Sequence, residues 1–309
     1  MAGQLRVYRS RMRSVQATKQ ITRAMELIAA SRIIKAQQRS RAAAPYARAI
    51  TRAVSALYAF SDTDHPLTTE RPEVRRSAVL IVTSDRGLAG GYSSSVLRES
   101  ERVITALRED GKEVATYLSG RKAIAFYTFR NRPFEQSWSG NSDEPAFETA
   151  QEIGRTLVDS FLAGGDAGGV DEIIIVFSRF VNMVTQAPEV IRLLPVEVVD
   201  DVAEAGGTEG TDANQGPLSL YDFEPGVDAV LDELMPQYIQ SRVYACLLSA
   251  AASELASRQR AMKSATDNAE ELIRGLRRQA NAARQGEITQ EISEIVGGAD
   301  ALAASTSSD

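Results

Sequence analysis

The chain has 309 residues, of which 43% are hydrophobic and 25% charged, and its formal charge at pH 7 is -6. These values are ordinary for a folded protein of two structural units, and no apolar run approaches the ~18 residues of a membrane-spanning helix. The single cysteine, Cys246, excludes an internal disulfide and favours a reducing, cytoplasmic setting, and the single histidine, His65, argues against a histidine-dependent triad or metal site.

The charge is distributed unevenly along the chain. Residues 1–60 carry 12 lysines and arginines and a single acid, Glu26, whereas residues 61–240 carry 15 basic and 31 acidic residues. A basic N-terminal segment on an acidic protein indicates that this segment meets an acidic partner.

The N-terminal segment predicts one long helix. Residues 2–60 contain one proline and one glycine and are rich in alanine, arginine, glutamine and leucine, which favour helix. About 50 helical residues would span roughly 75 Å, far more than an ordinary globular helix. The apolar seam of this helix is expected to consist of Leu5, Tyr8, Met12, Val15, Ile21, Met25, Ile28 and Ile33.

The middle of the chain alternates between predicted strands and helices. Strands are expected at 77–84, 112–119, 171–181 and 187–199, and helices at 93–110, 120–130 and 144–164. Strands that alternate with helices predict a mostly parallel sheet with both faces covered. Two stretches rich in glycine and acids, 162–171 and 203–217, are expected to be mobile loops.

A second long helix is expected from 226 to 296. Its seam repeats at alternating spacings of four and three, which is the heptad pattern of a coiled coil. The economical α/β fold is an antiparallel two-helix coiled coil of the N- and C-terminal helices with an inserted Rossmann-like α/β domain. The expected segments are 1–60, 61–225 and 226–309. The seam residues of the second helix are Arg258, Met262, Ala265, Ala269, Leu272, Leu276, Gln279 and Ala283.

Two stretches suggest a binding function, and each has a plainer alternative. The glycine-rich turn near 85–91 could hold an anion or nucleotide, but it matches neither G-x-x-x-x-G-K-S/T nor G-x-G-x-x-G. A tight turn before a helix capped by Ser93 is therefore favoured. The basic N-terminal helix suits nucleic acid by charge, yet its apolar seam requires a partner helix and it offers no base-stacking platform. A solvated charged face on a coiled coil is the alternative.

The C-terminal stretch combines a polar collar with an apolar tip. A free helix end of this kind needs a socket, unless it folds back onto the middle domain. No pair of acids marks a catalytic dyad, and Cys246 is interpreted as a small helix-packing residue. The collar consists of Arg284, Gln285, Thr289, Glu291 and Glu294, and the tip of Ile288, Ile292, Ile295, Val296 and Leu302.

These motifs together resemble the gamma-subunit family of F-type ATP synthases over nearly the whole chain. The stretch VQATKQITRAMELIAASRIIKAQ is similar to the family's N-terminal helix, and VTSDRGLAGG to its central motif, with Ala89 where the family usually has cysteine. The stretch ITQEISEIVGGADA fits the family signature I-T-x-E-x-x-D/E-x-x-x-G-A. The loop at 162–171 looks longer than is usual in the family.

The resemblance implies a central rotor shaft that performs no bond chemistry and needs no cofactor. A proton-driven membrane c-ring would turn the shaft inside a ring of alpha and beta subunits. The shaft would thereby change the conformations of the catalytic beta subunits, which make ATP from ADP and phosphate. The resemblance also implies contact with an epsilon subunit and a peripheral position on the cytoplasmic side of a bacterial plasma membrane, without nucleic acid.

The resemblance assigns roles to particular residues as well. Arg23, Met25, Arg32 and Lys35 would face an acidic loop of the beta subunit, and Arg284, Gln285, Thr289 and Glu291 would engage another beta-subunit loop. Tyr221 and Glu224 would belong to a foot near the c-ring. As a separate hypothesis, a projecting 162–171 loop would touch the stator and brake rotation. The competing classes are a stand-alone coiled-coil adaptor or nucleic-acid binder, and a nucleotide-binding enzyme built on the middle domain.

Overall fold

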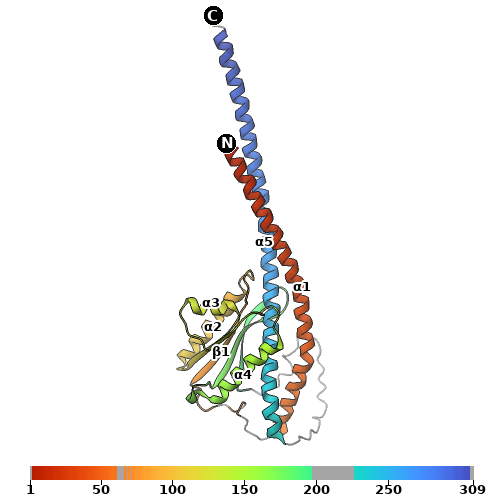
Figure 1. The fold of residues 1–309 in the computed structure, drawn as a ribbon, viewed down its shortest axis with the longest axis vertical. Helices are drawn as coiled ribbons and strands as arrows, with labels where there is room; N and C mark the ends of the chain where they lie inside the picture. The colour runs from red at the N-terminus through yellow and green to blue at the C-terminus, as the bar shows by residue number, and fades with distance from the viewer. Residues whose placement is uncertain (1, 61–65, 68, 70, 197–225, 307–309) are drawn as a thin grey trace. The chain divides into compact units, whose positions relative to one another are not determined.

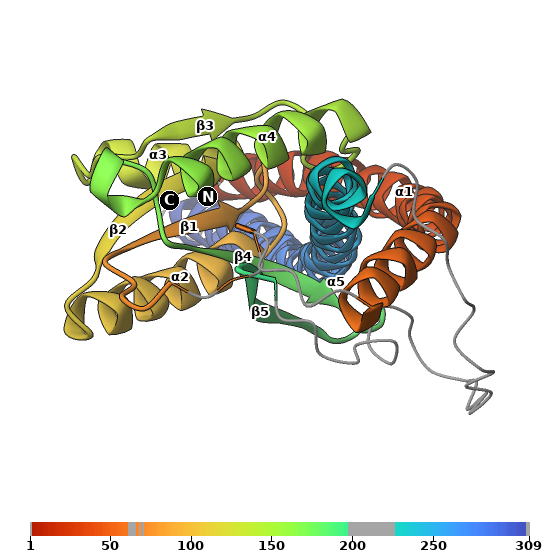
Figure 2. The ribbon, with the colours of Figure 1, turned by 90° about the horizontal axis from the view of Figure 1, so that it is seen from below.

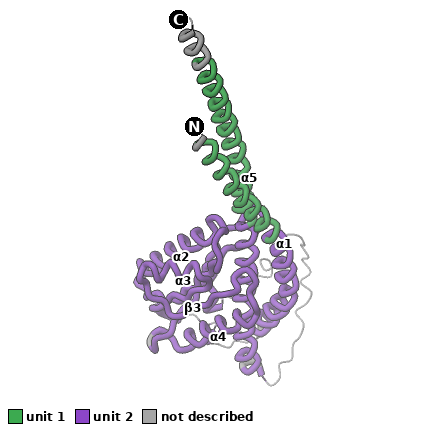
Figure 3. The backbone as a smooth tube through the Cα atoms, turned by 45° about the horizontal axis from the view of Figure 1, so that its top comes forward, with its two compact units in different colours: residues 1–28, 259–309 green, residues 29–258 purple. Residues whose placement is uncertain are grey.

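The computed structural model describes residues 2–60, 66, 67, 69, 71–196 and 226–306 (Figure 1). The chain divides into two compact units, which Figure 3 colours separately. The two-helix unit comprises residues 1–28 and 259–309, and the α/β unit comprises residues 29–258. Among the described residues, no helix is both long and apolar enough to cross a membrane.

Two long helices contribute to both units. Helix α1 extends over Ala2–Phe60 and helix α5 over Val227–Thr306, so the long helices predicted at the two ends of the chain are confirmed. Each helix contains one proline, Pro45 in α1 and Pro236 in α5. Alanine-rich sequences favour helix, but helices of this kind owe most of their stability to packing along one face.

The α/β unit is built on a five-stranded sheet of order β3-β2-β1-β4-β5 (Figure 2). Strands β1 to β4 are parallel, and β5 runs antiparallel to β4 at one edge. The predicted mostly parallel sheet is therefore confirmed. The sequence pattern does not predict β3, because three residues are too few to show a period. The strands are β1 (Arg76–Val82), β2 (Glu113–Ser119), β3 (Gln136–Trp138), β4 (Glu172–Phe180) and β5 (Gln186–Leu194).

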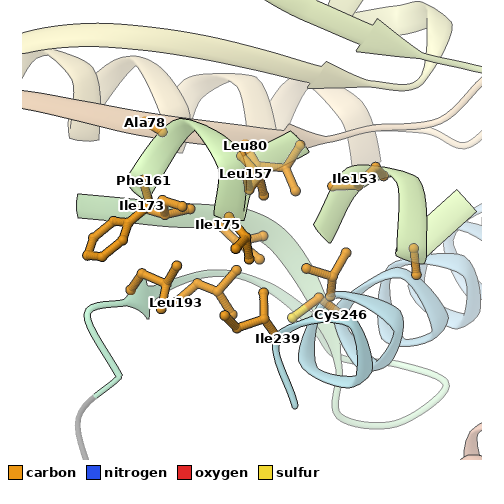
Figure 4. Packing of buried hydrophobic residues seen from close by; sticks show 14 of the residues in the cluster. Ala78, Leu80, Ile153, Leu157, Phe161, Ile173, Ile175, Leu193, Ile239 and Cys246 are labelled. Carbon is orange, nitrogen blue, oxygen red and sulfur yellow. The ribbon is translucent and has the colours of Figure 1, made fainter. Parts of the chain in front are cut away.

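Helices cover both faces of this sheet. Helices α2 (Tyr92–Glu109) and α3 (Arg121–Phe129) pack against the face that carries Val79 and Ile81 of β1. Helix α4 (Phe147–Ala163) and parts of α1 and α5 pack against the opposite face. Successive side chains of a strand point to opposite faces, so β1 contributes Ala78, Leu80 and Val82 to this second core. Figure 4 shows part of it, including Leu157, Ile175, Ile239 and Cys246.

Helices α1 and α5 contact each other through both polar and apolar residues. In the two-helix unit, the Thr22 and Thr266 hydroxyl groups lie 2.8 Å apart, and Lys19 Nζ lies 2.6 Å from Glu270 Oε1. In the α/β unit, Ile33 and Ala36 pack against a cluster of α5 residues, namely Ala252, Leu255 and Ala256. Residue numbers rise in one helix as they fall in the other, so these contacts run antiparallel.

The predicted seam of α1 is buried only in part. Ile33 is 1% exposed, and the partly buried members are Leu5, Tyr8, Met12, Val15 and Met25. Ile21 and Ile28 were expected inside, but they are 61% and 54% exposed, whereas Thr22 and Ala29 are buried. At these two positions small residues face the contact in place of large aliphatic ones. On α5, the predicted seam residues Arg258, Met262 and Ala269 are buried, but Leu272 and Gln279 are exposed.

Candidate functional site

The predicted contact residues of α1 differ in how far their charge is balanced within the chain. Arg23 Nη1 donates hydrogen bonds to both carboxylate oxygens of Glu26, at 3.1 and 2.9 Å. Glu26 is itself buried, so the one acid of α1 already has a partner. Met25 is half-buried, and Lys35 is exposed. Lys35 therefore keeps its ammonium group accessible to a partner.

Two other arginines of α1 bind the loop between β3 and α4. Arg32 forms an ion pair with Asp143, and Arg39 forms one with Glu144. Asp143 also lies 3.9 Å from the guanidinium group of Arg86. The predicted contact residue Arg32 is thus anchored within its own chain, although 41% of its side chain remains exposed.

Helix α1 also exposes large aliphatic side chains. Four of them are more than half exposed: Ile21, Leu27, Ile28 and Ile34. Single exposed aliphatic residues are normal, but several on one helix indicate a surface that another molecule covers. The sequence pattern places two of the four, Ile21 and Ile28, inside the helix pair instead, so this surface is not predicted from the sequence.

The end of α5 carries the predicted collar and tip on one continuous helix. The collar residues Arg284, Gln285, Thr289 and Glu291 are all exposed. The Thr289 hydroxyl donates to the carbonyl oxygen of Gln285 at 3.0 Å, so it is bonded within its own helix. The alternative in which this stretch folds back is wrong, because the helix continues to Thr306. The exposed tip residues are Ile288, Ile292, Ile295 and Val296.

A buried ion pair lies in α5 beside the sheet. Glu254 Oε1 and Arg258 Nη2 are 2.6 Å apart, and the two residues are 1% and 7% exposed. The Arg258 guanidinium group also donates to the carbonyl oxygens of Arg86 and Gly87, each at 3.4 Å. Burial raises the pKa of Glu254, and Arg258 and the Ser142 hydroxyl oppose this only in part. The heptad pattern finds Arg258 but not Glu254; the available signal is a Glu–Arg pair four residues apart in an Ala/Ser-rich run.

The glycine-rich turn after β1 is a structural junction. The Asp85 carboxylate accepts hydrogen bonds from the N–H groups of Arg121 at 3.0 Å, Gly140 at 2.8 Å and Ser142 at 2.9 Å. It thereby joins the start of α3 to the loop after β3. The predicted cap is wrong: α2 begins after Gly91 without a side-chain cap, and Ser93 Oγ lies 2.7 Å from Ser84 Oγ instead.

Asp171 organises the loop at 162–171. Its carboxylate accepts the N–H groups of Gly165 at 3.0 Å, Arg75 at 2.9 Å and Arg76 at 3.0 Å, and it pairs with Arg71 at 2.9 Å. Burial pushes the pKa of Asp171 up, but these hydrogen bonds and Arg71 outweigh burial, so the pKa lies below its usual value. The loop contains a 3-10 turn, Gly165–Ala167, and its mobility stays a prediction.

Some predicted residues lie outside the described part of the chain. These are Tyr221 and Glu224 of the expected foot, His65, and the loop at 203–217. Cys246 is 6% exposed in the core, as its packing interpretation predicts. Burial raises the pKa of its thiol to about 12, which keeps the group protonated at neutral pH.

Comparison with known proteins gives consistent matches over the whole chain. A family model described as ATP synthase matches residues 4–302. The ATP synthase gamma chain of Kineococcus radiotolerans is 64% identical over 309 residues, covering 99% of each chain. That of Beutenbergia cavernae is 56% identical over 305 residues, covering 99% of this chain and 100% of the other.

Solved structures share the fold at lower identity. A chain of the Euglena gracilis mitochondrial ATP synthase OSCP/F1/c-ring structure matches with a TM-score of 0.66 and 14% identity, covering 99% of this chain and 97% of that chain. A chain of the Tetrahymena thermophila mitochondrial ATP synthase central stalk/c-ring structure matches with a TM-score of 0.56 and 22% identity, covering 79% of this chain and 99% of that chain.

Proposed function

The chain belongs to the ATP synthase gamma-chain family, and from this membership we propose that it is the central rotor shaft of an F-type ATP synthase. It couples proton-driven rotation of the membrane c-ring to conformational changes at the catalytic beta subunits, which make ATP from ADP and phosphate. The chain itself is a non-catalytic, peripheral subunit at the cytoplasmic face of a bacterial membrane.

The observation that carries this proposal is the exposed end of α5. A helix that exposes Ile288, Ile292 and Ile295 lacks the side-chain packing from which long helices gain most of their stability. A socket made by the surrounding alpha and beta subunits would supply that packing. The exposed aliphatic residues of α1 have the same requirement.

In this proposal the shaft is an antiparallel coiled coil of α1 and α5. The contacts of Thr22 with Thr266 and of Lys19 with Glu270 support it, since both join the two helices in the order expected for an antiparallel pair. Segments 1–60 and 226–309 then form the shaft, and segment 61–225 forms a Rossmann-like domain that receives torque. The sheet order 3-2-1-4 matches the first four strands of the doubly wound order 3-2-1-4-5-6.

Two helices cannot present identical faces to three beta subunits, and this asymmetry is the mechanism. At any angle the shaft makes different contacts with each beta subunit. A partner shifts a conformational equilibrium only through such differential contacts, so rotation moves each preference to the next subunit. Exposed ion pairs contribute only about 0–1 kcal/mol each, which suits a surface that must slide.

The proposed contacts fall into three groups. Arg23, Met25, Arg32 and Lys35 face a beta-subunit loop, and Lys35 is exposed. Arg284, Gln285, Thr289 and Glu291 form a second beta-subunit contact that breaks and reforms during rotation. Tyr221 and Glu224 belong to the foot beside the c-ring, where the epsilon subunit also binds.

Direct observation of rotation tests the function. Cys246 is the single cysteine and is buried, so a Phe129→Cys substitution at an 87% exposed position provides one accessible labelling site. The variant is co-expressed with its native alpha and beta subunits, the assembly is fixed to a surface through the beta subunits, and a bead is attached to the new thiol. ATP is expected to drive rotation of the bead in one direction.

The chain without the Phe129→Cys substitution is the control for this experiment. Its buried thiol should bind no bead. Failure of the chain to co-purify with alpha and beta subunits, or bead motion that is unaffected by ATP, would contradict the proposed function.

A further inference from the structure

One face of α5 is joined to the α/β layer by polar bonds as well as by apolar packing. Ser253 Oγ donates to the carbonyl oxygen of Ser178 in β4 at 2.9 Å, and the Phe180 N–H donates to Ser249 Oγ at 3.0 Å. The Tyr92 hydroxyl at the start of α2 donates to the carbonyl oxygen of Ala250 at 3.2 Å. These bonds attach α5 to the end of β4 and to the start of α2.

The buried pair Glu254–Arg258 continues this line of bonds. Removing two charges from water is costly, and apolar residues of similar volume often stabilise a protein equally well. Stability alone therefore does not account for a pair that is 1% and 7% exposed. An apolar pair could not form directional hydrogen bonds. The Arg258 guanidinium group donates hydrogen bonds to two carbonyl oxygens of the turn after β1, those of Arg86 and Gly87. The pair therefore fixes the position of α5 along that turn.

The same turn is linked to α1 on its other side. Asp85 in the turn accepts the N–H of Ser142, and the neighbouring residue Asp143 pairs with Arg32 of α1. Arg39, about two helical turns after Arg32 on α1, pairs with Glu144. The turn at 85–87 and the loop at 142–144 thus join both long helices to the sheet.

We propose that Glu254 and Arg258 are positioning residues of rotary coupling, which lock α5 to the α/β domain so that the domain and the helix turn as one body. The inference rests on the proposed rotor function. Torque that enters through the α/β domain reaches the shaft across this junction. ATP hydrolysis by the alpha and beta subunits requires only that the shaft turns. ATP synthesis requires in addition that torque passes from the α/β domain to α5 without the two moving relative to each other.

The test compares ATP synthesis with ATP hydrolysis in the complete enzyme in sealed vesicles. Synthesis is driven by an imposed proton gradient, and hydrolysis is measured without a gradient. The variants are Arg258→Lys, which keeps the charge but loses the forked reach to two carbonyls, and the double variant Glu254→Met/Arg258→Met, which leaves no unpaired buried charge. The double variant is expected to lower the ratio of synthesis to hydrolysis by about fivefold or more, the lower end of ordinary coupling between sites. The lysine variant is expected to lie between it and wild type.

Control variants distinguish weaker attachment of α5 to the α/β domain from a loss of folded, assembled enzyme. Arg102→Gln breaks an exposed Arg–Glu pair on α2 and should leave the ratio unchanged. A purely structural role would lower synthesis and hydrolysis together at constant ratio, as would poor folding, and that result in the double variant would overturn the inference. An enzyme assembled without this chain that still couples ATP synthesis to the proton gradient would instead refute the rotor function itself.

Discussion

The hydroxyl groups of Thr22 in α1 and Thr266 in α5 lie 2.8 Å apart, although 244 positions separate the residues in the chain. Thr266 Oγ1 also lies 2.9 Å from the carbonyl oxygen of Met262. Thr22 Oγ1 likewise lies 3.1 Å from the carbonyl oxygen of Lys19. Because a hydroxyl group has one proton, one threonine donates across the helix pair while the other donates to a carbonyl oxygen of its own helix. Both side chains are buried, so this short chain of bonds fixes the register of the two helices.

Valine substitutions at these two positions should show a coupled loss of stability. Thr22→Val or Thr266→Val alone is expected to lower the free energy of unfolding by about 1 kcal/mol, because the remaining hydroxyl loses a buried partner. The double variant should lose less than the sum of the two. Urea unfolding of the purified chain, followed by far-ultraviolet circular dichroism, measures this; strictly additive losses would show that the hydroxyl groups do not interact.

The carboxylate of Asp171 should stabilise the α/β unit in a pH-dependent way. Asp171→Asn is expected to lower the free energy of unfolding at pH 7 by about 2–3 kcal/mol, because an amide oxygen cannot replace four charge-assisted bonds. The pKa of Asp171 is lowered on folding, so its contribution is full above the unfolded pKa of about 3.9 and is lost as pH falls through the folded value. The gap between wild type and variant should therefore close in acid.

Trp138 makes this measurement specific. It is the single tryptophan of the chain and is buried in the α/β unit, so its fluorescence reports unfolding of that unit. Asp159→Asn, at an exposed position of α4, is the matched control and should change little. A gap that stays constant from pH 7 to strong acid would contradict the assigned role of Asp171.

Gly120 is predicted to tolerate no side chain. Its φ is 97°, and a Cβ atom there would lie 2.3 Å from the carbonyl oxygen of Thr83. Gly120→Ala should cost more than about 2 kcal/mol, since backbone strain of about 1–3 kcal/mol adds to the clash. Gly111→Ala is the control, because Gly111 has a φ of 81° but open space around it. Equal losses in the two variants, measured by urea unfolding, would show that the clash is relieved.

The collar of α5 should matter to turnover but not to folding. Glu291 is exposed, so Glu291→Gln is expected to change the stability of the chain by less than about 0.5 kcal/mol. In the assembled enzyme the lost charge-assisted bond should slow ATP hydrolysis by about tenfold, the equivalent of about 1.4 kcal/mol. Glu271→Gln, at another exposed position of α5, should leave the rate unchanged. Equal rates for the two variants would remove Glu291 from the contact.

The sequence predicts most elements of this fold because their periods are long and clear. Strands such as β4, a nearly continuous apolar run, and helices rich in alanine stand out by pattern alone. The position of the helix contact does not follow in the same way. Large aliphatic residues at Ile21 and Ile28 suggest a seam by hydropathy, but close packing selects Thr22 and Ala29. Hydropathy cannot distinguish an apolar residue that faces its own chain from one that awaits another subunit.

The residues of the candidate site also differ in whether the sequence predicts them. The collar and tip of α5 follow from the sequence because a polar cluster beside isoleucines is a local signal. The pairs that join the long helices to the sheet, such as Arg32 with Asp143, span more than a hundred residues and have no local signature. The Asp171 cluster escapes prediction for the same reason, since three of its four donors precede it by about a hundred positions.

The two edges of the sheet have a consequence for the chain before it joins a larger assembly. One edge strand, β3, has only three residues, and the other, β5, contains Pro188, which has no N–H for an incoming strand. Short edges and prolines hinder the addition of a strand from another molecule. Newly made copies are thus protected from polymerising edge to edge, even before another subunit covers the exposed apolar residues at the end of α5.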